Sequence, residues 1–181
     1  MIEKIAGTDE VGRGALAGPV IAAAVILKKN IDGLKDSKEL SAKKRFELSE
    51  KILKNSYYAF GQATNIEIDK INILNASLLA MKRAILKLPV KPTLVLVDGI
   101  YKPDLNVQME AIVSGDSLKK EISAASIIAK VYRDNLMLNY DKEFPAYSFK
   151  DNKGYGTKKH LDSIKIYGST EIHRKSFKGV S

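Results

Sequence analysis

Residues 2–27 read IEKIAGTDEVGRGALAGPVIAAAVIL. Residues 2–8 and the Val- and Ile-rich stretch 19–27 each predict a β-strand, and the second is apolar enough to be buried on both faces. Asp9 and Glu10 come directly after the first predicted strand, and a glycine-rich segment follows them. This stretch therefore predicts the centre of a sheet, with acidic side chains at a strand end.

The remainder of the chain predicts an alternation of strands and helices. Ser41 and Asn65 are expected to cap the first two helices, with Phe46 and Ile52 on the buried side of the first. Further strands are predicted over 57–63, 93–97 and 107–112, and helices over 42–54, 65–88, 118–140 and 158–167. This order indicates one α/β domain with a mixed sheet over residues 1–181.

Composition narrows the class of partner and the cellular compartment. The chain has 30 Lys and Arg against 21 Asp and Glu, a net charge of +9, which suits a polyanion such as nucleic acid or an anionic membrane surface. The longest apolar run, 15–27, is shorter than the roughly 20 residues needed to cross a bilayer. Glu3 and Lys4 stand where a signal peptide is apolar. We expect a monomeric, cytoplasmic protein without a membrane partner.

The scarcity of nitrogen and sulfur ligands limits the metals that the chain could hold. There is no cysteine, and there are only two histidines. A site with several ligands must therefore consist mainly of carboxylates, and oxygen ligands favour Mg²⁺ or Mn²⁺ over zinc or copper.

Acidic residues follow several predicted strands. Asp98 ends the strand at 93–97, and Asp116 lies in a Gly-Asp-Ser turn after the strand at 107–112. Asp9 and Glu10 can face one site if the chain turns at the glycines that follow, and neighbouring strand ends commonly form a ligand crevice. Clustered carboxylates repel one another unless a cation neutralises them, which favours a shared metal site. Each acid could instead cap a helix or form a turn.

The glycines at 12, 14 and 18 partly resemble a dinucleotide-binding fingerprint. That fingerprint requires a helix start, whose positive end meets the pyrophosphate. Here Pro19 begins a predicted strand, and Asp9 and Glu10 would repel phosphates. Dinucleotide binding is therefore excluded.

Seven motifs, in order, closely resemble those of the ribonuclease HII family. They are TDEVGRGALAGPV at 8–20, DSKEL at 36–40, VDG at 97–99, GDS at 115–117, SAASIIAKVYRD at 123–134, GYGTKKHL at 154–161 and HRKSF at 173–177. The resemblance spans almost the whole chain. The related ribonuclease HIII usually carries threonine at the position of Arg13 and a separate N-terminal domain, so type HII is preferred.

The resemblance implies a fold and a reaction. The fold is the ribonuclease H-like one, with a five-stranded mixed sheet flanked by helices. The reaction is endonucleolytic hydrolysis of the RNA strand in RNA/DNA hybrids, and at ribonucleotides embedded in duplex DNA, by two Mg²⁺ or Mn²⁺ ions. The implied products carry 5′-phosphate and 3′-hydroxyl ends.

The resemblance also implies site residues. The catalytic residues and metal ligands are Asp9, Glu10, Asp98 and Asp116, and the substrate-binding residues are Gly12, Arg13, Gly14, Ser37, Lys38 and Tyr155. A basic C-terminal helical segment, 142–181, has nine Lys or Arg against four Asp or Glu and is expected to face the duplex. Asp134 is expected to be structural. His160 is expected to lie on a helix face and His173 to make a phosphate or structural contact, and neither is expected to be a metal ligand.

Two alternatives stay open. A nuclease of the same fold that acts on DNA junctions would share the acids without needing the Gly-Arg-Gly segment or Tyr155. A non-catalytic binding module would keep the basic face, but it would not need four acids that oppose nucleic acid binding.

Overall fold

The protein, described here by a computed structural model that covers residues 4–34 and 40–180, is built on a five-stranded sheet. The strand order is β3-β2-β1-β4-β5. Strand β2 pairs antiparallel with both β1 and β3. Strand β4 pairs parallel with both β1 and β5, so the predicted mixed sheet is confirmed. The strands are β1 Ile5–Val11, β2 Val20–Leu27, β3 Ser56–Ala63, β4 Leu94–Asp98 and β5 Gln108–Ile112.

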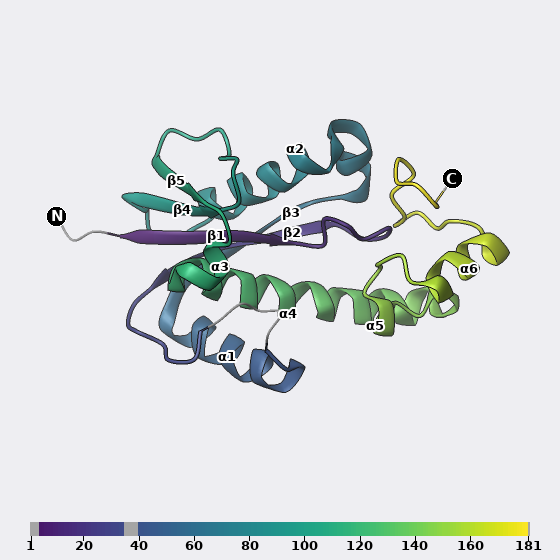
Figure 1. The fold of residues 1–181 in the computed structure, drawn as a ribbon, viewed down its shortest axis with the longest axis horizontal. Helices are drawn as coiled ribbons and strands as arrows, with labels where there is room; N and C mark the ends of the chain where they lie inside the picture. The colour runs from purple at the N-terminus through teal and green to yellow at the C-terminus, as the bar shows by residue number, and fades with distance from the viewer. Residues whose placement is uncertain (1–3, 35–39, 181) are drawn as a thin grey trace.

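Helices cover both faces of the sheet. Helix α2 lies on one face, and α1 and α4 lie on the other, while α5 and α6 extend past the end of the β1–β2 pair (Figure 1). The helices are α1 Ala42–Asn55, α2 Asn65–Leu86, α3 Gly115–Leu118, α4 Lys120–Glu143, α5 Phe149–Asn152 and α6 Lys158–Tyr167, with a 3-10 turn, η1, at Pro145–Tyr147. Within the described residues, no helix is long and apolar enough to cross a membrane.

Strand β2 is the centre of the core because it is buried on both faces. Successive side chains of a strand point to opposite faces. Val20, Ala22, Ala24 and Ile26 accordingly pack in the cluster under α2, whereas Ala23 and Val25 pack in the cluster under α4 and α1. The helices meet the sheet with small side chains, which bring their backbones close to the strands.

A very close helix-to-sheet approach is made at Gly7 of β1. A Cβ atom at Gly7 would lie 2.1 Å from the carbonyl carbon of Glu121 and 2.3 Å from the amide nitrogen of Ile122, both at the start of α4. Only glycine permits this approach, which lays α4 directly across β1. The packing fixes which α4 side chains face the end of β1.

Three predictions made from the sequence about these elements differ from the structure. Strand β1 continues through both acids to Val11, because Asp9 and Glu10 pair with Ala23 and Ala22 of β2. The chain turns only after both acids, at Gly12, where φ is 92°; Gly12 is one of the two glycines expected to supply the turn.

The cap of α2 is Thr64 and not Asn65. Thr64 and Glu67 form a capping box, in which the Thr64 hydroxyl accepts from the Glu67 amide and the Glu67 carboxylate accepts from the Thr64 amide. Phe46 is 55% exposed, since α1 packs through Leu48 and Ile52 instead. Ser41 caps α1 as predicted.

Replacing Gly7 by alanine should lower the free energy of unfolding by about 1–3 kcal/mol, because the added methyl group must push α4 away from β1. Urea denaturation measures the difference. Gly14→Ala is the control, since a Cβ atom there meets no atom within 4 Å; it should change the free energy by at most about 1 kcal/mol. A Gly7→Ala protein as stable as the wild type would contradict the prediction.

Candidate active site

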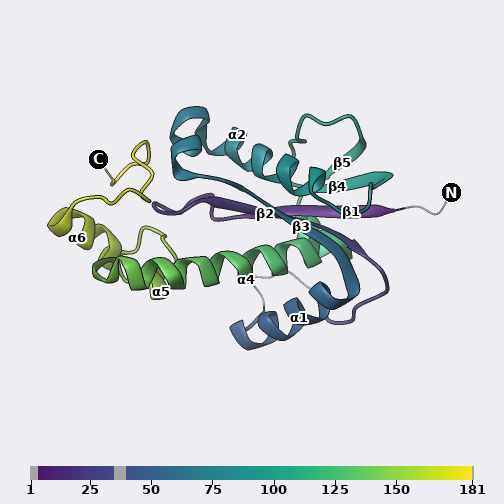
Figure 2. The ribbon, with the colours of Figure 1, turned by 180° about the vertical axis from the view of Figure 1, so that it is seen from behind.

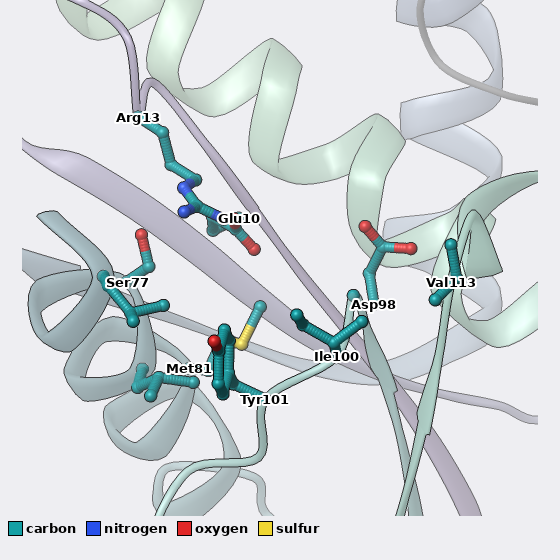
Figure 3. Close-up of a pocket in the computed structure, with 11 residues that line it drawn as sticks. Glu10, Arg13, Ser77, Met81, Asp98, Ile100, Tyr101 and Val113 are labelled. Carbon is teal, nitrogen blue, oxygen red and sulfur yellow. Dashed lines mark hydrogen bonds and ion pairs between the residues drawn. The ribbon is translucent and has the colours of Figure 1, made fainter.

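Asp9, Glu10 and Asp98 meet at the ends of two adjacent parallel strands. Thr8 of β1 pairs with Val97 of β4, so the acid that follows each of these residues lies at the same edge of the sheet. All three acids line a cleft of about 440 Å³. Glu10 and Asp98 also line a smaller pocket of about 210 Å³ on the α2 side, where Figure 3 shows both side chains projecting from adjacent strands.

Asp9 is the most buried of these three acids and faces α4. Its Oδ1 atom accepts a hydrogen bond from the amide of Glu10 at 2.7 Å, and the Ser126 hydroxyl also donates to it. Burial raises the pKa of Asp9 well above its ordinary value, and the charges of Glu10 and Asp98 raise it further. The two hydrogen bonds lower that pKa but do not offset these effects. A nearby cation would stabilise the ionised form.

Glu10 faces α2 and forms an ion pair with Arg13. The Arg13 Nη1 atom donates to Oε1 of Glu10 at 3.1 Å, and the Arg13 side chain is 52% exposed. Burial raises the pKa of Glu10, the Arg13 charge and hydrogen bond oppose that rise, and the charge of Asp98 adds to it. Arg13 therefore contacts a predicted metal ligand directly, besides lining the cleft.

Asp98 connects the end of β4 to the segment that carries Asp116. Its Oδ1 atom accepts a hydrogen bond from the amide of Gly115 at 2.7 Å. Asp116 follows on the short helix α3, not in a turn as the sequence suggested, and it is buried. Asp116 does not line the cleft with the other three acids.

The acids do not form a complete coordination shell. Across residues 4–34 and 40–180, no group of three or more His, Asp or Glu side chains is arranged to hold a metal ion. Their chemistry nevertheless fits a hard cation, because they supply carboxylate oxygens and the most buried one is surrounded by like charge. Asp9, Glu10 and Asp98 are the residues that a divalent cation would draw together first.

The Gly12–Gly14 segment forms one wall of the cleft. Two buried arginines, Arg133 and Arg174, contact this segment. Arg133 of α4 donates to the carbonyl oxygens of Ala17, Pro19 and Lys153 at 2.8–3.1 Å. A Cβ atom at Gly12 would lie 2.1 Å from the Arg133 Nε atom, so no larger residue fits there.

Arg174 is the second of these arginines. It donates to the carbonyl oxygens of Arg13 and Gly18 at 2.8 and 3.0 Å. Burial, followed by the charge of Arg133, lowers the pKa of Arg174 to about 9, so it stays charged at neutral pH. The roles of both arginines were not predicted from the sequence, because a buried cation that pairs with backbone carbonyls leaves no periodic pattern.

Tyr155 lines the same cleft as the three acids. It forms a β-bridge with Ala15, and the Leu16 amide donates to the Gly154 carbonyl at 2.7 Å. Its ring centroid is 5.6 Å from the Arg133 guanidinium carbon. The predicted grouping of Tyr155 with the glycine segment is therefore seen in the structure.

The other predicted residues fall in three places. Ser37 and Lys38 lie outside the described residues. Asp134 pairs with Lys130 at 2.7 Å on α4, and the two histidines are buried against each other away from the acids. Ser126 and Lys130 line the cleft but were missed as site residues, although the SAASIIAKVYRD motif contains both.

The sequence matches one protein family along almost its whole length. Residues 6–180 match the sequence model of the family described as Ribonuclease HII. The chain belongs to the ribonuclease HII family. It is 58% identical to ribonuclease HII of Pelagibacter ubique over 180 residues, 98% of this chain and 97% of that protein. It is 54% identical to that of Borreliella burgdorferi, over 96% of this chain and 98% of that protein.

Solved structures show the same fold. The crystal structure of ribonuclease H2 from Pyrococcus horikoshii OT3 superposes with a TM-score of 0.80 at 27% identity, over 98% of this chain and 95% of that one. Bst-RNase HIII in complex with Mn²⁺ superposes with a TM-score of 0.76 at 19% identity, over 98% of this chain and 68% of that one. The protein is thus a metal-dependent endoribonuclease that cleaves RNA strands and acts on nucleic acid.

Asp9→Asn should raise the free energy of unfolding at pH 7.5 in EDTA by roughly 1 kcal/mol, or about 2–4 °C in melting temperature. The folded pKa of Asp9 is raised, so its contribution to stability is present at low pH and is lost as pH rises through that pKa. Asparagine has no such loss, and the gap between variant and wild type should widen from pH 4 to pH 7.5. Thermal unfolding measures it.

Asp134→Asn is the matched control for this prediction. It removes an acid that pairs with Lys130 outside the acidic group, so it should destabilise by at most about 1 kcal/mol. An Asp9→Asn protein that is less stable than wild type at pH 7.5 would show that Asp9 is not a source of repulsion.

Proposed function

We propose that the protein hydrolyses the RNA strand of RNA/DNA hybrids and incises duplex DNA at embedded ribonucleotides, leaving 5′-phosphate and 3′-hydroxyl ends. One observation carries the proposal: the cleft that holds Asp9, Glu10 and Asp98 is also lined by Gly12–Gly14 and Tyr155. Groups suited to phosphodiester hydrolysis thus lie beside groups suited to reading a sugar. The cytoplasmic location, the monomeric state and the single catalytic domain over residues 1–181 are part of the same proposal.

The metal ligands in this proposal are Asp9, Glu10, Asp98 and Asp116, which would hold two Mg²⁺ or Mn²⁺ ions. The raised pKa of Asp9 and the carboxylate character of the group support it. When bound, such ions lower the pKa of an attacking water and neutralise charge at the leaving oxygen. The Gly115 amide donates a hydrogen bond to the Asp98 carboxylate. The residue before Asp116 thus contacts one of the proposed ligands, which supports the inclusion of Asp116.

The protein's own residues orient the acids and receive the phosphate. Ser126 and the Glu10 amide hold the Asp9 carboxylate by hydrogen bonds, and Arg13 holds Glu10. Because the Arg13 side chain is 52% exposed, a substrate phosphate can reach its guanidinium while Nη1 stays on Glu10. Arg13 therefore connects substrate binding to the placement of an acid.

Sugar recognition falls to the glycine segment and Tyr155. The 2′-hydroxyl alone separates ribose from deoxyribose, so a detector must approach the sugar closely. Space around Gly14 is open for 4 Å from the position of its absent Cβ atom, so a sugar can approach its backbone. Tyr155 lines the same cleft and can contact the sugar or the phosphate beside it.

Duplex binding is assigned to the basic charge of the chain, +9 overall. Ser37 and Lys38, with the segment 142–181, are proposed phosphate contacts, which position a duplex without reading its sequence. Binding by such contacts weakens as salt rises.

Asp9→Asn should reduce incision of a DNA duplex carrying one ribonucleotide by at least about 1,000-fold, because one carboxylate of the proposed metal site is lost. The measurement is a gel-based cleavage assay in Mg²⁺ or Mn²⁺, with an all-DNA duplex alongside. Asp134→Asn should cut at the wild-type rate. Equal cutting of the all-DNA duplex by the wild type, or binding without incision, would refute the proposed specificity or activity.

Tyr155→Ala should lower kcat/KM on the ribonucleotide duplex by about 10- to 100-fold, since a group touching the sugar is removed. Tyr155→Phe separates the contribution of the hydroxyl from that of the ring. Tyr57→Ala is the control, because Tyr57 lies on β3 beside Ile26, away from the cleft. Unchanged kcat/KM in Tyr155→Ala would remove Tyr155 from sugar recognition.

A further inference from the structure

His160 and His173 form a buried pair that the proposed mechanism does not use. Both residues have 0% exposure, and their Nε2 atoms are 3.1 Å apart. His160 lies in the first turn of α6, and His173 follows that helix. The rings of Tyr147 and Phe149 pack against both imidazoles.

The hydrogen bonds around the pair determine both tautomers. The Thr170 amide donates to Nδ1 of His173 at 3.0 Å, so that nitrogen carries no proton. Neutral His173 must then be protonated on Nε2, from which it donates to Nε2 of His160. His160 must in turn be protonated on Nδ1, from which it donates to the Tyr155 carbonyl oxygen at 2.9 Å. We call this chain from Thr170 to Tyr155 the histidine relay.

The surroundings keep both rings neutral. Burial, and then the proximity of His160, lowers the pKa of His173 to about 4; burial also lowers the pKa of His160. In the described part of the chain, no carboxylate contacts either ring. At neutral pH the donors and acceptors of the relay are therefore fixed.

The relay joins two segments that pair with the chain directly after the Gly12–Gly14 wall. On the His160 side, Tyr155 forms a β-bridge with Ala15; on the other side, His173 itself forms a β-bridge with Ala17. Both views of the ribbon show the C-terminal segment beside the turn that connects β1 and β2 (Figures 1 and 2). The contact between the two imidazoles is thus a direct side-chain link between these two segments.

We propose that His160 and His173 are positioning residues that hold the Tyr155 segment at a fixed distance from the Gly12–Gly14 wall. Neither ring touches the cleft, so the relay acts through the Tyr155 backbone and not on the substrate. The inference rests on the sugar-reading role proposed for Tyr155.

His173→Asn tests the relay at its centre. The asparagine oxygen can still accept from the Thr170 amide, but the side chain is too short to reach His160. We expect kcat on the ribonucleotide duplex to fall about tenfold, since small misplacement of a contacting group is costly. KM should change by less than about twofold, because duplex affinity comes mainly from phosphate contacts.

Phe149→Leu is the matched control for lost packing. Phe149 is fully buried against the same two rings but makes no hydrogen bond in the relay. With all proteins assayed well below their melting temperatures, Phe149→Leu should keep kcat within about twofold of wild type, even where it is equally destabilised. Equal losses of kcat in both variants would overturn the proposal in favour of a general packing role.

A double-mutant cycle links the relay to Tyr155. In a Tyr155→Ala background, His173→Asn should change kcat by less than about twofold, because the group to be positioned is gone. The same tenfold loss in both backgrounds would overturn the proposal. If Tyr155→Ala alone left kcat and KM unchanged, the sugar-reading role would fail and the positioning role would fail with it. Full activity of His173→Asn, beside a normal loss in Tyr155→Ala, would overturn the positioning role alone.

The tautomers give a test that does not depend on activity. Nitrogen NMR of ¹⁵N-labelled imidazoles at pH 7 should show an unprotonated Nδ1 in His173 and an unprotonated Nε2 in His160. The opposite tautomer in either ring, or a charged ring, would overturn the relay.

Discussion

Mutual repulsion among carboxylates at a partly dry strand end is the constraint on which the rest of the cleft depends. Sheet register fixes the backbones of Asp9, Glu10 and Asp98 next to one another at this edge, so their side chains stay close. The structure offsets part of the repulsion with neutral donors, namely Ser126 and the amides of Glu10 and Gly115, and with one cation, Arg13. The hydrophobic core must hold the strands together against the remaining repulsion between the carboxylates.

That core is placed to resist the repulsion directly. Strand β2 is buried on both faces and pairs along the length of β1, and α4 rests on β1 through Gly7. The contact that brings α4 close to the sheet also brings Ser126 to Asp9. The packing of α4 on β1 therefore also determines the geometry of the site.

Much of this could be predicted from the sequence, because the fold depends on local signals. Runs of Val and Ile, helix caps and prolines mark the elements, and acids next to such runs mark a strand end. The motifs of the family added Tyr155 and the Gly12–Gly14 segment to the same site. Element ends were less accurate: β1 runs on to Val11 because it pairs with β2, a tertiary effect that the local sequence does not record.

The supporting polar groups could not be predicted for a related reason. Arg133 and Arg174 bind backbone carbonyls more than 100 residues away along the chain, except for the Lys153 contact, and any residue type provides a carbonyl. The ion pair of Arg13 with Glu10 was equally hidden, since both residues also fitted separate roles. Distant partners without side-chain identity leave nothing for a sequence pattern to detect.

The bonds from Arg174 to the carbonyls of Arg13 and Gly18 span 161 and 156 residues, which gives the molecule an order of assembly. Contacts of such separation form late, because a long loop must close before they are made. On the ribosome, the sheet and its acids emerge and can pack well before Arg174 is synthesised. A nascent chain therefore has the acids without the ordered wall that would present a duplex to them, and the cleft matures only when the last part of the sequence folds back onto the first.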